Sequence, residues 1–128
     1  MISQNNKRVG NKIEVEVANY LFQKKYWVHL LKQGVKGQPF DLIAVKNNKA
    51  LMGDVKHCSQ NRFDFKRIEP NQYTSMELAL ECGNTNIGFF LVGMCDEIKF
   101  IKRTNLKKLV LENKIKSINL GSEYVENI

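Results

Sequence analysis

The chain has 128 residues, 43% of them hydrophobic and 26% charged, as expected for a globular protein that folds as one domain. Its 20 Lys and Arg residues outnumber 13 Asp and Glu residues, and the net charge of +7 favours a polyanionic partner, nucleic acid before membrane. No apolar run reaches the roughly 18 residues of a membrane span, and no secretory signal is visible. The three cysteines, Cys58, Cys82 and Cys95, lack the spacing of a disulfide framework or a zinc site. We therefore expect a cytoplasmic protein.

The first half of the chain predicts one helix and three strands. Residues 11–24 repeat apolar side chains at helical spacing, among them Ile13, Val17 and Leu21. A strand is expected over residues 26–31, and a loop with two glycines follows over residues 32–39. Two apolar runs, 42–46 and 50–56, flank the dipeptide Asn47-Asn48 and predict an antiparallel hairpin.

The second half predicts a helix, two strands and a last helix. Residues 63–68 fit a short strand or an extended arm. Pro70 suits the first turn of a helix over residues 71–81, which Gly83 ends. The most apolar run, 87–94, predicts a central strand, and a strand over 97–101 and a helix capped by Thr104 follow. Residues 115–128 are ambiguous, with an edge strand as one interpretation.

This order of elements, α-β-β-β-α-β-β-α, predicts an α/β fold with a mixed central β-sheet flanked by helices. No linker or repeat divides the sequence. We therefore expect a single domain over residues 1–128, with its core at about residues 8–113.

The predicted hairpin carries charged residues at one end. Asp41 precedes its first strand, and Asp54 and Lys56 lie near the end of its second strand. Side chains alternate between the two faces of a strand, so Asp54 and Lys56 share a face. Antiparallel pairing would place Asp41 near Asp54. Charge concentrated beside apolar strands indicates a functional site.

The first helix adds a third carboxylate. At 100° per residue, Glu14 lies within the apolar arc of the helix, whereas Glu16 lies beside its polar face. One interpretation is a Glu at the core edge that a lysine or backbone N–H groups satisfy. The other joins Glu14 to Asp41 and Asp54, since three carboxylates that face the interior repel one another unless a cation lies among them. Mg²⁺ takes such oxygen ligands, and in a basic protein this suggests metal-dependent phosphodiester hydrolysis.

These residues resemble the motif of the PD-(D/E)XK nucleases, in which a Pro-Asp pair at a strand start precedes Asp/Glu-x-Lys on the next strand. The matching segments are Pro39-Phe40-Asp41 and Asp54-Val55-Lys56. The spacing of Arg8, Gly10 and Glu14 is similar to that of small Holliday-junction resolvases and virus-type replication-repair nucleases. The sequence departs from the pattern by inserting Phe40 and by having Asp54 where Glu is commoner.

The resemblance implies a restriction-endonuclease-like core and a Mg²⁺-dependent endonuclease, with Mn²⁺ as a substitute. It implies one or two metal ions held by Glu14 (directly or through water), Asp41, Asp54 and the backbone carbonyl of Val55. Lys56 would position the attacking hydroxide or steady the scissile phosphate. Gln72, which matches a Gln that opens the following helix in several relatives, would hold a water or the lysine. The products would carry a 5′-phosphate and a 3′-hydroxyl.

Basic residues near this site predict contacts with DNA phosphates. They are Lys7, Arg8, Lys32, Lys36, Arg62, Lys66 and Arg67. The resemblance further implies branched or four-way DNA as the substrate, a role in recombination and repair, and a homodimer. Phe63 and Phe65 are either core residues or a dimer surface. The alternative function is a catalytically silent module of the same fold that binds DNA or protein.

Overall fold

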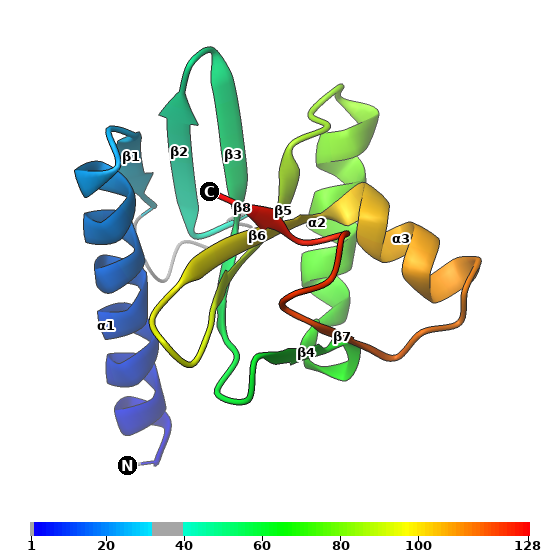
Figure 1. The fold of residues 1–128 in the computed structure, drawn as a ribbon, viewed down its shortest axis with the longest axis horizontal. Coiled ribbons are helices and arrows are strands. Elements are labelled where there is room, and N and C mark those ends of the chain that lie inside the picture. Colours follow the sequence, from blue (N-terminus) through cyan, green and yellow to red (C-terminus); the bar gives the residue numbers. More distant parts are fainter. Residues whose placement is uncertain (1, 32–39) are drawn as a thin grey trace.

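The computed structural model describes residues 2–31 and 40–128, with the helical backbone alone over 2–11 (Figure 1). The chain begins with the helix α1 (Ile2–Gln23), and a mixed sheet of six strands forms the centre. The order across this sheet is β1-β2-β3-β5-β6-β8, with β3 and β5 parallel and all other neighbours antiparallel. The strands are β1 (Trp27–Leu30), β2 (Leu42–Lys46), β3 (Lys49–His57), β5 (Ile87–Val92), β6 (Ile98–Lys102) and β8 (Glu126–Asn127).

Helices cover both faces of the sheet, which is the expected α/β class (Figure 1). Helix α1 packs on one side, and α2 (Pro70–Glu81) and α3 (Arg103–Leu111) pack on the other. The fully buried strand β5 contributes side chains to the cores on both faces of the sheet, since successive side chains alternate between the faces. Phe90 packs in the core under α1 with Val17 and Leu21, whereas Phe89 packs in the core under α2 and α3.

A small second sheet lies at the end of the molecule opposite the turn of the β2–β3 hairpin (Figure 1). It pairs β4 (Arg62–Asp64) with β7 (Ser117–Asn119), and the short 3₁₀ helix η1 (Phe65–Arg67) follows β4. Residues 63–68 are therefore part strand and part helix. Phe63 and Phe65 are both buried, which settles their alternative in favour of the core.

Two sequence predictions about element boundaries are wrong. Helix α1 begins at Ile2, well before residue 11. Helix α3 begins directly after β6 with Lys102 at its N-cap, so Thr104 lies inside the helix and does not cap it. Residues 115–128, whose structure the sequence left open, form the short strand β7 (Ser117–Asn119) and the two-residue strand β8. No helix within the described part of the chain is long and apolar enough to cross a membrane.

The β2–β3 hairpin forms as predicted, and its turn explains the register. Asn47 and Asn48 both adopt positive φ, 53° and 65°, the combination that a two-residue hairpin turn requires and that asparagine tolerates. Lys46 then pairs with Lys49, and Leu42 pairs with Gly53. This register decides which residues meet at the far end of the hairpin.

Candidate active site

The hairpin register brings Asp41 and Asp54 together. Leu42 pairs with Gly53, so the next position places Asp41 opposite Asp54. Backbone hydrogen bonds fix Asp41 there: its N–H donates to the carbonyl of Gly53 over 3.2 Å, and its carbonyl accepts from Leu31 over 2.9 Å. The N–H of Val55 also lies 3.4 Å from Oδ2 of Asp41. The proximity expected from antiparallel pairing is confirmed.

Asp54 is a buried carboxyl group, with 5% of its surface exposed. Its pKa is raised from 3.8 to about 8, chiefly by burial and then by the nearby charge of Asp41 and a hydrogen bond to the Asp41 side chain. Lys56 opposes this shift, and Glu14 adds to it with the smallest effect. At neutral pH and without a cation, Asp54 therefore holds a proton that it shares with Asp41 in a hydrogen bond.

Lys56 lies on the same face of β3 as Asp54, as alternation predicts. Its Nζ lies 6.0 Å from the ring centroid of Phe89 and donates a long hydrogen bond of 3.4 Å to the carbonyl of Arg67. The Arg67 guanidinium in turn donates to the carbonyl of His57 over 2.7 Å. The helix η1 is thus fastened to the end of β3 and supplies a backbone partner to Lys56.

This role of Arg67 was not found from the sequence, which predicts it only as a phosphate contact. The contact depends on the 3₁₀ turn that follows β4 and on the pairing of β4 with β7, a strand more than fifty residues later in the chain. No local pattern marks such an arrangement.

Glu14 lies half-buried on α1, and Glu16 is exposed, as the helical wheel predicts. Glu14 raises the pKa of Asp54, so it lies within electrostatic reach of the hairpin end. Asp41, Asp54 and Lys56 thus meet at the hairpin end, and Glu14 acts on Asp54 from helix α1 with the smallest of these effects. Their roles as ligands or catalytic groups stay predictions.

Gln72 has a structural task at the start of α2. It is the third residue of the helix, and its Oε1 accepts a hydrogen bond of 3.0 Å from the N–H of Glu69, closing a capping box. Its amide nitrogen can still donate to a water, whereas the predicted contact with Lys56, which only donates, would need Oε1 to accept a second hydrogen bond.

The predicted DNA-binding residues after β3 lie on or beside η1. Arg62 is exposed, and its Nε donates to Oγ of Ser117 over 3.0 Å. Lys66 has 85% of its side-chain surface exposed and lies 3.9 Å from Asp64, a weak contact. Lys7 and Arg8 belong to α1, and nothing further is described for them; Lys32 and Lys36 lie outside the described residues.

The oxygen-rich set Asp41, Asp54 and the Val55 carbonyl fits a hard divalent cation in its chemistry. Over residues 12–31 and 40–128, no three His, Cys, Asp or Glu side chains lie close enough to hold one ion as they stand. Mg²⁺ does not need three, because it is commonly bound through one or two carboxylates with waters and substrate phosphates. Neither a family model nor a curated protein matches the chain.

Proposed function

We propose that the chain is a Mg²⁺-dependent DNA endonuclease with a restriction-endonuclease-like core, selective for branched DNA such as a four-way junction. One observation carries the proposal. A buried aspartate, Asp54, faces a second aspartate, Asp41, at a strand end, and Lys56 follows on the same face. This is the arrangement that Asp-x-Lys nucleases require.

The electrostatics of Asp54 support a cation at this position. Its ionised form is disfavoured by burial and by the charges of Asp41 and Glu14, with Lys56 alone opposing them. A divalent cation would reverse that balance and release the proton of Asp54. Asp41, Asp54 and the Val55 carbonyl would be its ligands, with Glu14 acting directly or through water.

A bound metal ion would supply an activated water and neutralise charge on the phosphate. Lys56 would orient that water or stabilise the negative charge that develops on the phosphate oxygens. The carbonyl of Arg67 holds the ammonium group at the strand end before substrate arrives. Cleavage would leave a 5′-phosphate and a 3′-hydroxyl.

The substrate class rests on charge and position. The net charge of +7 attracts a polyanion, and Arg62, Lys66 and Arg67 follow the strand that carries Lys56. A homodimer would match the two-fold symmetry of a four-way junction.

A second candidate function is a catalytically silent module of the same fold that binds DNA or protein. The hydrogen bond between Asp54 and Asp41 favours it, because a protonated pair is satisfied without any cation. In that case the pair would be a structural feature of the hairpin end.

Cleavage of labelled four-way, flap and linear DNA in Mg²⁺ separates the two candidates. We expect wild type to cut branched DNA and Lys56→Ala to cut at least about 100-fold more slowly with DNA binding retained. The matched control is Lys46→Ala, on the neighbouring strand, whose Nζ bonds the carbonyl of Lys24 over 2.8 Å. If wild type binds but cuts nothing in Mg²⁺ or Mn²⁺, or if Lys56→Ala cuts equally well, the enzyme proposal is lost.

A further inference from the structure

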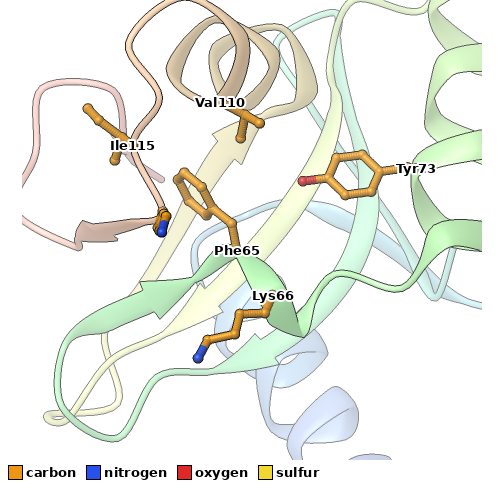
Figure 2. A pocket seen from close by; sticks show the side chains of 6 residues that line it. Phe65, Lys66, Tyr73, Val110 and Ile115 are labelled. Atoms are coloured by element: carbon orange, nitrogen blue, oxygen red, sulfur yellow. The ribbon is translucent and has the colours of Figure 1, made fainter.

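A pocket of about 380 Å³ opens between η1, α2 and the segment after α3 (Figure 2). This volume lies within the range of small-ligand sites. Its lining has an aromatic and aliphatic part and two lysines: Phe65, Tyr73, Val110, Ile115, Lys66 and Lys116.

The two aromatic walls are held in place by their own contacts. Phe65 packs edge-on against Phe63 at a centroid distance of 5.7 Å. The Arg103 guanidinium lies 4.3 Å from the ring centroid of Tyr73, and Glu77 holds that guanidinium at 2.9 Å. Figure 2 shows the hydroxyl end of Tyr73 directed toward Phe65. Rings that are already fixed lose little freedom when a flat ligand stacks on them.

The pocket combines these aromatic walls, the rings of Phe65 and Tyr73, with positive charge. Lys66 and Lys116 are both exposed, and no acidic residue is among the six that line the pocket. In Figure 2 the Lys66 side chain points away from the rings of Phe65 and Tyr73. Aromatic walls with ammonium groups at the edge of the pocket suit a nucleotide, because the base can stack on the rings while the ammonium groups contact its phosphates outside.

The helix η1 connects this pocket with the candidate active site. Its first two residues, Phe65 and Lys66, line the pocket, and the carbonyl of its third, Arg67, accepts the hydrogen bond from Lys56. One three-residue helix thus supplies both part of the pocket lining and the backbone partner of Lys56.

We infer that the pocket holds an unpaired nucleobase of the bound DNA strand, with Lys66 and Lys116 at its flanking phosphates. This inference rests on the proposed function and deepens it, because a site for an unpaired base would select branched or distorted DNA over a regular duplex.

Binding is tested in EDTA, so that cleavage plays no part, with a short duplex and the same duplex carrying one unpaired 2-aminopurine. Ile115→Glu places a carboxylate at the pocket, where Ile115 is 38% exposed, and Leu111→Glu, at a position 65% exposed, is the charge-matched control outside it. Tyr73→Leu removes a stacking wall without changing charge. Thermal unfolding establishes that each variant folds.

We expect wild type to quench the 2-aminopurine fluorescence and to prefer the unpaired probe. Ile115→Glu and Tyr73→Leu should each weaken binding of that probe roughly tenfold, while binding of the paired duplex stays within about twofold of the Leu111→Glu control. Equal losses on both probes, or none, would overturn the inference even if wild type cuts four-way DNA. If the variants lose binding of the unpaired probe alone and wild type cuts no DNA, the pocket inference is supported and only the nuclease proposal is refuted.

Discussion

Replacing Asp54 by Asn should stabilise the metal-free protein, and by clearly more at pH 8 than at pH 5. Burial, with Asp41 and Glu14, raises the pKa of Asp54 from 3.8 to about 8. The folded state thus holds a proton that the unfolded state has lost. This contribution to stability is fully present below pH 3.8 and disappears as the pH rises through about 8.

The size of the effect follows from proton linkage. Between the two pKa values of Asp54, each pH unit lowers the free energy of unfolding by about 1.36 kcal/mol. From pH 5 to pH 8 the loss is at most about 4 kcal/mol, or roughly 15 °C in Tm for a chain of this size. The side-chain amide of the Asp54→Asn variant stays neutral and avoids this loss.

The assay is thermal unfolding in EDTA across this pH range. Asp96→Asn is the matched control, because Asp96 is exposed and its φ of 57° suits asparagine. We expect the Tm difference between Asp54→Asn and wild type to grow from pH 5 to pH 8, with no such trend in the control. A difference that does not change with pH would refute the reasoning.

Addition of Mg²⁺ provides a second arm of this experiment. At pH 8, saturating Mg²⁺ should raise the Tm of wild type, because ligation stabilises ionised Asp54 and binding at about 100 times Kd adds about 2.7 kcal/mol. Asp54→Asn should show little of this increase. Equal stabilisation of both proteins would place the cation elsewhere.

Two further predictions concern stability. Gly53→Ala should cost about 2 kcal/mol or more and lower the Tm, because a Cβ on Gly53 would collide with the backbone carbonyl of Gly88 in the parallel strand β5; an unchanged Tm would contradict this close approach. Glu77→Ala should cost about 3 kcal/mol in urea unfolding, since it leaves Arg103, 7% exposed, without its partner at 2.9 Å, whereas Lys107→Ala removes only an exposed partner of Glu77 and should cost under about 1 kcal/mol. Equal costs for these two variants would show that the burial of Arg103 does not matter.

The parts of the site that follow from local patterns could be predicted from the sequence. The Asn47-Asn48 turn and its flanking apolar runs specify the hairpin, and the register then places Asp41 opposite Asp54. Helical periodicity separates half-buried Glu14 from exposed Glu16. Each prediction needs only the geometry of one element or one hairpin.

The parts that depend on distant contacts could not be predicted. The hydrogen bond from Lys56 to Arg67 exists because η1 folds back on β3 beside the β4–β7 sheet. Gln72 shows a different problem: the sequence motif predicts a catalytic role, but in the structure its side chain closes a capping box. A residue that fits a catalytic motif also fits a common helix signal, and the sequence alone does not choose between them.

A crystal soaked in Mn²⁺ near pH 8 and measured for anomalous scattering tests the central claim most directly. The account predicts a peak between the carboxylates of Asp41 and Asp54 and next to the Val55 carbonyl, and its loss in Asp54→Asn. A fully occupied Mn²⁺ elsewhere, with Asp54 still hydrogen-bonded to Asp41 in wild type, would contradict the claim that this pair is the metal site of a nuclease.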